Sequence, residues 1–229
     1  MSELDNSNAG APTDSADAAP QLSVAEARII GSLIEKEATT PDVYPLTLNA
    51  IVTACNQKTA REPTMQLEQG EVANALRRLE MRGWVKSQHT ARAERYSHRA
   101  GTVLDLTRPQ TALLGLLLLR GPQTTHELLA RSERMAKFES VGDVQYALER
   151  LAQHTPTIVR VIPRQSGQRE DRYGHLLSGE PVYLGGGGGG WSGEEGGGAA
   201  APSSAVLERI AALEAKVAEL EARLEAAGA

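Results

Sequence analysis

The residues best suited to contact a nucleic acid gather in one short stretch, EVANALRRLEM at positions 71–81. Its apolar residues recur with the spacing of a helix that packs one face against a core. The opposite face would then present Asn74, Arg77 and Arg78. Asparagine and arginine carry the hydrogen-bonding groups that match the edges of adenine and guanine, respectively. The pattern predicts a helix that reads duplex DNA with this face.

Further basic residues flank this stretch. Lys58 and Arg61 precede it, where we expect them to hold phosphates and to fix the register of the helix. The polar segment after it adds four more side chains of this kind: Lys86, His89, Arg92 and Arg95. Acidic residues are interleaved with these cations, so the alternative interpretation is an ordinary solvated surface.

Signals for catalysis or metal binding are weak. The five histidines lie far apart in the sequence, without metal-ligand spacing or partner cysteines. They are His89, His98, His126, His154 and His175. The sequence also contains no P-loop and no serine-nucleophile motif. We therefore expect a protein that is not an enzyme and that holds no metal and no cofactor.

The single cysteine, Cys55, continues an apolar stripe formed by Leu48, Ile51 and Val52. This spacing directs its side chain into a core, where a cysteine behaves as a small hydrophobic residue. The alternative is a reactive thiol, which would need exposure and an electropositive surrounding.

Two pairs of segments show that one unit occurs twice. EVANALRRL at 71–79 matches DVQYALERL at 143–151, and ERYSH at 94–98 matches DRYGH at 171–175. A looser match pairs GSLIEK with GLLLLR upstream. Three matches in the same order predict an internal structural repeat.

Each copy is expected to contain three helices and a two-stranded hairpin. Ser23 and Glu26 form a capping box at the start of the first helix. The other expected helices are 44–57, 68–82, 109–121, 125–135 and 142–153, and the expected strands start at 84, 95, 157 and 172. This order is the winged form of helix-turn-helix, in which the third helix enters the major groove.

The two copies differ in charge. The third helix of the second copy presents Gln145, Tyr146, Glu149 and Arg150, which gives it no positive excess. The second hairpin still carries basic residues, namely Arg164, Arg169 and Arg172. We expect the first unit to contact DNA and the second to serve dimerisation or partner contact.

Composition divides the chain into five segments. They are a disordered acidic tail (1–20), a first winged-helix domain (21–103), a second winged-helix domain (104–183), a flexible glycine-rich linker (184–205) and a C-terminal helix (206–229). The C-terminal helix has an a/d seam typical of a parallel coiled coil, which predicts a homodimer. The seam consists of Val206, Ile210, Leu213, Val217, Leu220 and Leu224. The alternative is an amphipathic helix that docks on its own chain.

The net charge of −5 is unevenly distributed. Residues 1–20 carry four acidic residues and no basic one, and residues 181–229 carry seven acidic and three basic ones. The middle of the chain is mildly basic, which permits a phosphate-bearing partner.

The expected cellular compartment follows from features that the sequence lacks. One cysteine excludes an intramolecular disulfide, and the N-terminus has no secretory signal. The longest apolar run is too short to span a bilayer. We expect a soluble intracellular protein without membrane contact.

Three stretches closely resemble the bacterial YceH-like family: LSVAEARIIGSLIEKEATTPDVYPLTLNAIVTACNQKTAREP, LLLRGPQT and GQREDRYGHLLSGE. The resemblance covers roughly residues 21–180. It implies tandem winged-helix domains and a bacterial cytoplasmic setting, and it brings no catalytic residues.

Two functions remain open at this point. The first is a DNA-binding protein, such as a transcriptional regulator, that uses the third helix and wing of the first unit. The second is a non-catalytic scaffold or adaptor with protein partners, as tandem winged helices form in chromosome-organising complexes. The weak basic excess is compatible with both.

Overall fold

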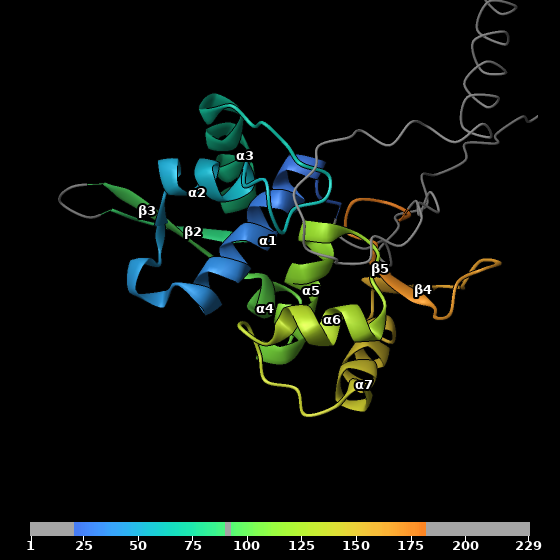
Figure 1. Cartoon of the computed structure of the whole chain (residues 1–229). Helices are drawn as coiled ribbons and strands as arrows, with labels where there is room; N and C mark the ends of the chain where they lie inside the picture. Colours follow the sequence, from blue (N-terminus) through green and yellow to red (C-terminus); the bar gives the residue numbers. More distant parts are fainter. Residues whose placement is uncertain (1–20, 90–92, 182–229) are drawn as a thin grey trace, which may run out of the picture. The chain divides into compact units, whose positions relative to one another are not determined.

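The computed structural model describes residues 21–89 and 93–181 (Figure 1). The acidic tail, Arg92, the glycine-rich linker and the predicted coiled-coil seam lie outside these residues. The described residues all belong to one compact unit. The boundary between two domains at residue 103 stays a prediction. Within the described ranges, each helix is too short or too polar to cross a membrane.

The first half of the described chain combines three α-helices with a small antiparallel sheet. Its elements are α1 (Val24–Thr39), the 3-10 helix η1 (Pro41–Val43), β1 (Leu46–Thr47), α2 (Leu48–Cys55), α3 (Gln69–Met81), β2 (Val85–His89) and β3 (Glu94–His98). The strand order is β1-β3-β2. The predicted helices and hairpin are confirmed, whereas β1 and η1 are additions that the sequence pattern does not predict.

The second half has the same order of main elements. They are α4 (Ala100–Val103), α5 (Arg108–Arg120), α6 (Thr125–Ser132), α7 (Val141–Ala152), β4 (Val159–Ile162) and β5 (Arg172–His175). Strands β4 and β5 form a second antiparallel sheet. The described chain is therefore mainly α-helical with small antiparallel sheets, as predicted.

Local sequence signals set the helix ends. The Ser23 hydroxyl accepts a hydrogen bond from Glu26 N, and the Glu26 carboxylate accepts one from Ser23 N, which confirms the predicted capping box. Helix α5 ends at Gly121, whose φ of 70° suits a residue without a Cβ. The helices then bury their apolar faces in one continuous core.

The internal repeat extends to single backbone pairs. Leu46 of β1 pairs with Tyr96 of β3, and Gln123 pairs with Tyr173 of β5 as an isolated bridge. Both partners in the second pair lie 77 positions after those in the first. This is the offset that relates ERYSH to DRYGH. In the second half, the single residue Gln123 thus occupies the position that strand β1 has in the first half.

Helices α1 and α5 lie side by side and join the two halves (Figure 1). A Cβ on Gly31 of α1 would lie 3.1 Å from the Cβ of Leu118. A Cβ on Gly115 of α5 would lie 2.7 Å from Cγ2 of Ile34. Because Gly31 corresponds to Gly115 and Ile34 to Leu118 in the repeat, the two halves make reciprocal contacts around a pair of glycines.

Candidate nucleic-acid interface

Helix α3 is anchored by one face and exposed on the other. Val72, Ala75, Leu76 and Leu79 are buried, as the helical spacing predicts. Asn74 and Arg77 are exposed. Among the described residues, nothing forms a hydrogen bond or ion pair with the Arg77 side chain. These two side chains are therefore free to meet a partner.

Arg78 lies on the same helix but faces α1. Its Nε donates to the Glu26 carboxylate at 2.9 Å, and Arg82 Nη1 donates to the other oxygen at 3.2 Å. Burial raises the pKa of Glu26, but the Ser23 N–H and the two guanidinium groups outweigh this and leave the pKa below its ordinary value. Arg78 therefore ties α3 to α1, and its contact with a base edge stays a prediction because its side chain is 50% exposed.

Arg61 is buried rather than available to a phosphate. Its side chain has no exposed area, and Nη2 lies 2.7 Å from the Glu35 carboxylate. Nη1 reaches the second carboxylate oxygen at 3.2 Å, and Nε donates to Ala54 O at 3.0 Å. This bidentate pair corrects the prediction that Arg61 contacts DNA, because the side chain is buried and each of its three guanidinium nitrogens already has a protein partner.

The contact with Arg61 also shifts the pKa of Glu35. Burial raises the pKa of this carboxyl, but the hydrogen bonds and charge of Arg61, helped by Lys36, outweigh burial and hold the pKa below its ordinary value. The pair is therefore charged at neutral pH and belongs to the folded core.

Arg95 is the third arginine of the predicted DNA-binding set that has a structural partner. Its Nη1 donates to Pro45 O at 2.7 Å and to Val43 O at 3.2 Å, so it holds the segment before β1. Arg172, 77 positions later, donates in the same way to Pro122 O at 3.1 Å. The repetition assigns Arg95 a role in the fold, which corrects its placement in the DNA-binding set.

Arg92 lies outside the described residues, and His89 Nε2 lies 3.6 Å from the Glu94 carboxylate. Four other members of the predicted set are exposed, and their side chains have no hydrogen-bond or ion-pair partner in the described part of the chain: Lys58, Asn74, Arg77 and Lys86. We call these four residues the α3 patch. Lys58 lies in the α2–α3 connection and Lys86 on β2, so the patch extends from α3 to both of its flanks. The Glu80 carboxylate accepts hydrogen bonds from Ser87 N and Oγ, which fixes the end of α3 against β2. The patch therefore sits on a braced helix and strand.

The corresponding surface of the second half is not cationic. On α7, Gln145 Nε2 donates to the Glu149 carboxylate at 3.0 Å. Tyr146 is 67% exposed on the same helix. This arrangement agrees with the uneven charge of the two copies.

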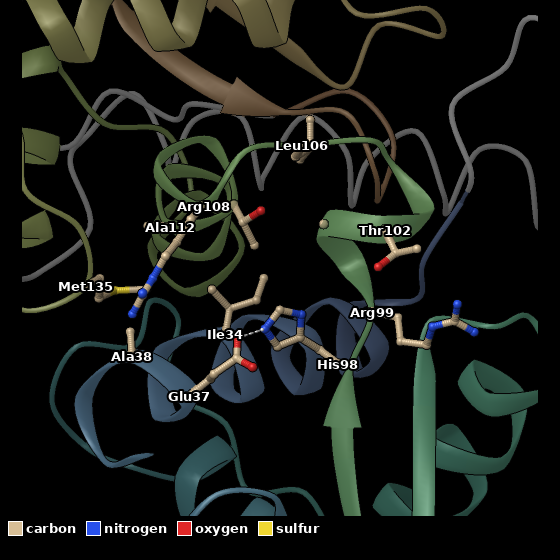
Figure 2. Close-up of a pocket in the computed structure, with 12 residues that line it drawn as sticks. Ile34, Glu37, Ala38, His98, Arg99, Thr102, Leu106, Arg108, Ala112 and Met135 are labelled. Atoms are coloured by element: carbon tan, nitrogen blue, oxygen red, sulfur yellow. Dashed lines mark hydrogen bonds and ion pairs between the residues drawn. The ribbon is translucent and has the colours of Figure 1, made fainter.

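A cavity of about 640 Å³ opens between α1, the β3–α4 junction and α5 (Figure 2). His98 Nε2 lies 2.7 Å from Oε2 of Glu37, and Nδ1 accepts a hydrogen bond from Ala100 N at 3.3 Å. Hydrogen bonding to His98 lowers the pKa of Glu37, and the charge of Arg108 adds to this effect. Both ring nitrogens are engaged, so the imidazole connects α1 to the β3–α4 junction rather than serving as a free base.

Cys55 is fully buried, as its spacing predicts. Burial raises the pKa of the thiol to about 11, so the thiolate is scarce at neutral pH. The core role is confirmed over the reactive one. Among residues 21–89 and 93–181, no cluster of three or more His, Cys, Asp or Glu side chains has the arrangement of a metal site.

Comparison with known proteins identifies the family. Residues 22–168 match the model of a family described as a protein of unknown function, DUF480. The chain is 59% identical over 217 residues to a UPF0502 protein of Xanthomonas euvesicatoria pv. vesicatoria, and the match covers 92% of this chain and 97% of the relative. It is 54% identical over 209 residues to a UPF0502 protein of Mesorhizobium japonicum, with 91% and 97% covered. The chain therefore belongs to the DUF480 family of bacterial UPF0502 proteins, which confirms the resemblance to the uncharacterised YceH-like family.

Proposed function

We propose that the protein binds duplex DNA through the α3 patch, with the first half acting as a winged helix. The observation that carries this proposal is the exposed pair Asn74 and Arg77 on α3, flanked by the lysines at positions 58 and 86. In a helix-turn-helix protein the corresponding helix enters the major groove, and the flanking cations hold the phosphates.

The order of elements supports the winged-helix assignment. A short strand between the first two helices pairs with β3, and the β2–β3 hairpin then follows α3. The second half has the same order, with Gln123 in place of β1. We therefore assign a tandem pair of winged helices, of which the first meets DNA.

The internal ion pairs favour a precise presentation of the patch. Arg78 and Arg82 hold α3 on Glu26, while Glu80 holds its C-terminal end on β2. A side chain that projects from a braced helix loses less freedom on binding than one on a mobile loop. The patch is small, so we expect modest affinity that depends on salt.

Substitution of the patch tests this proposal. Arg77→Ala is expected to weaken duplex binding because it removes a side chain of the helix that enters the groove, and Lys86→Ala is expected to weaken binding and also to lower the magnitude of the salt slope by about 1, because Lys86 is one of the flanking cations that hold phosphates. Fluorescence anisotropy with a labelled duplex at several salt concentrations measures both quantities. Arg150→Ala is the matched control, since Arg150 is an exposed arginine on α7. Equal losses in Arg77→Ala and Arg150→Ala would refute the assignment to α3.

A protein-interaction scaffold is the second candidate, and one surface favours it. A groove of about 740 Å³ runs beside α7 and is lined by Leu106, Pro109, Phe138 and Tyr146. An exposed tyrosine beside a partly buried phenylalanine, here Tyr146 and Phe138, is typical of protein contacts. Absence of duplex binding would leave this groove as the main functional surface.

A further inference from the structure

The cavity between α1, the β3–α4 junction and α5 carries two opposite charges that form no ion pair with each other within the described residues. We call it the Glu37 cavity. Glu37 lies near the C-terminal end of α1, and Arg108 is the first residue of α5. Figure 2 shows the Arg108 side chain extending from α5 toward α1. Glu37 Oε2 is 2.7 Å from His98, whereas Glu37 Oε1 and the Arg108 guanidinium have no hydrogen-bond partner in the described part of the chain.

Both charged groups are accessible to a ligand in this cavity. The Glu37 side chain is 53% exposed, and Arg108 is exposed as well. Hydrogen bonding to His98 lowers the pKa of Glu37, burial opposes this, and the charge of Arg108 lowers the pKa further. The two charges are therefore near each other, and each still has atoms that a ligand can contact.

The internal repeat contains an equivalent cavity in the second half. It has a volume of about 200 Å³ and is lined by His175, the counterpart of His98, so we call it the His175 cavity. The helical walls of the two cavities also correspond, at the 84 positions that separate Gly31 from Gly115. Three of the matched pairs are Ile34 with Leu118, Ala38 with Pro122, and Ala112 with Arg28.

The His175 cavity differs from the Glu37 cavity at both charged positions. At the same offset, Gly121 stands in place of Glu37 and Val24 in place of Arg108. The helices pack at the equivalent place without these two charges, so the fold does not require the pair. The Glu37 cavity is also the larger of the two, at about 640 Å³. It therefore combines additional space with an added pair of opposite charges.

From these observations we propose that the Glu37 cavity binds a free α-amino acid with an apolar side chain. Arg108 donates to the carboxylate of the ligand, and Glu37 Oε1 accepts from its ammonium group. Ile34, Leu106 and Met135 offer apolar surface to the side chain of the ligand. The volume lies within the range of about 300–1,000 Å³ that is usual for small-molecule pockets.

A ligand with a single charge fits this pair less well than a zwitterion does. An anion bound to Arg108 lies near the Glu37 carboxylate, and an amine bound to Glu37 lies near the Arg108 guanidinium, so each meets one like charge. Arg99 also lines the cavity, but its side chain points away from this pair (Figure 2). An amino acid satisfies both charges at once. The proposal does not rest on DNA binding, because none of the residues of the α3 patch lines this cavity.

Isothermal titration calorimetry of the full chain with L-leucine, L-methionine and L-phenylalanine tests this proposal. Each amino acid is compared with the two analogues that lack its ammonium or its carboxylate group, which for leucine are isocaproate and isoamylamine. The proposal requires saturable binding of at least one amino acid, with both of its analogues binding at least about tenfold more weakly. No saturable binding of any of the three up to about 10 mM, or an analogue that binds within about tenfold of its amino acid, would overturn it.

Three variants locate the site. Arg108→Gln removes the partner of the ligand carboxylate and is expected to weaken amino-acid binding about tenfold or more, because charged hydrogen bonds are strong. Glu37→Gln should weaken binding to a similar extent, while it keeps a polar group beside His98. Arg99→Gln is the matched control and is expected to leave the dissociation constant unchanged, since Arg99 lines the same cavity but points away from the pair. Unchanged binding in Arg108→Gln, or equal weakening in Arg108→Gln and Arg99→Gln, would refute the site.

Discussion

Replacing Arg61 by alanine is expected to lower the free energy of unfolding by about 3–5 kcal/mol. The side chain is fully buried and binds both oxygens of Glu35, a carboxylate that is itself only 15% exposed. The substitution leaves this carboxylate with Lys36 as its nearby cation and also removes a hydrogen bond to Ala54 O. Urea denaturation followed by circular dichroism at pH 7 measures the loss.

The pH dependence of this loss has a definite sign. The pKa of Glu35 in the folded wild type lies below its ordinary value, so the pair contributes stability above the ordinary carboxyl pKa and loses it as the pH falls through the folded pKa. In Arg61→Ala, burial acts with less opposition and raises that pKa. The deficit of the variant should therefore shrink as the pH is lowered from 7 towards 4.

Arg77→Ala is the control for this experiment. Arg77 is exposed on α3, so its removal is expected to change stability by no more than about 0.5 kcal/mol. The two arginines thus have different roles: Arg61 stabilises the core, and Arg77 lies on the proposed interface. Similar stability losses in both variants would contradict this division.

Replacing Gly115 by valine is expected to destabilise the protein by about 3 kcal/mol. Even the first added carbon would lie 2.7 Å from Cγ2 and 3.1 Å from Cβ of Ile34, a buried residue on α1. The branched side chain adds two more carbons at the closest contact between α1 and α5. The gain in helix propensity over glycine, about 1 kcal/mol or less, offsets only part of this. Thermal and urea unfolding give the magnitude.

Gly70→Ala is the matched control for the helix-propensity effect. Gly70 lies in α3, and an added Cβ there has no atom within 4 Å. This variant is expected to gain about 0.5–1 kcal/mol. If Gly115→Val were as stable as the wild type, α1 and α5 would have room to separate, and the reciprocal glycine contact would not hold the two halves together.

The sequence predicts the helices, the hairpins and the repeat well because these depend on local periodicity. The apolar faces of α3 and α7 recur at helical spacing, and glycine or a capping box marks several helix ends. Strand β1 escapes prediction because it has two residues, and its pairing with Tyr96 depends on contacts 50 positions away. Such short strands have no periodicity to read.

The interface was harder to predict than the fold. Arg78 and Arg77 are neighbours in sequence, yet one closes an ion pair with Glu26 and the other remains exposed. Their chemistry is identical, so only the packing of α3 on α1 separates them. The role of Arg61 is equally hard to predict, since it lies in the α2–α3 connection and its partner Glu35 lies on α1.

Arg28 shows a signal that sequence reasoning can use. Arg28 interrupts the apolar run of α1 between Ala27 and Ile29, at a position that becomes buried. An arginine at a core-facing position implies a partner, whether a residue or a ligand. Its hydrogen-bond partners, the carbonyl oxygens of Cys55 and Pro63, lie 27 and 35 positions away and appear only in three dimensions.

Wild-type binding to a random duplex tests the central claim most directly. Titration of the full chain into labelled duplex DNA, from low to physiological salt, gives the affinity and its salt dependence. The two lysines of the α3 patch predict a slope of log affinity against log salt of about −2 for each bound chain. The account predicts saturable binding at low salt that falls steeply as salt is added. The contradicting result is no binding at low salt with roughly tens of micromolar protein, a concentration within the range of nonspecific dissociation constants.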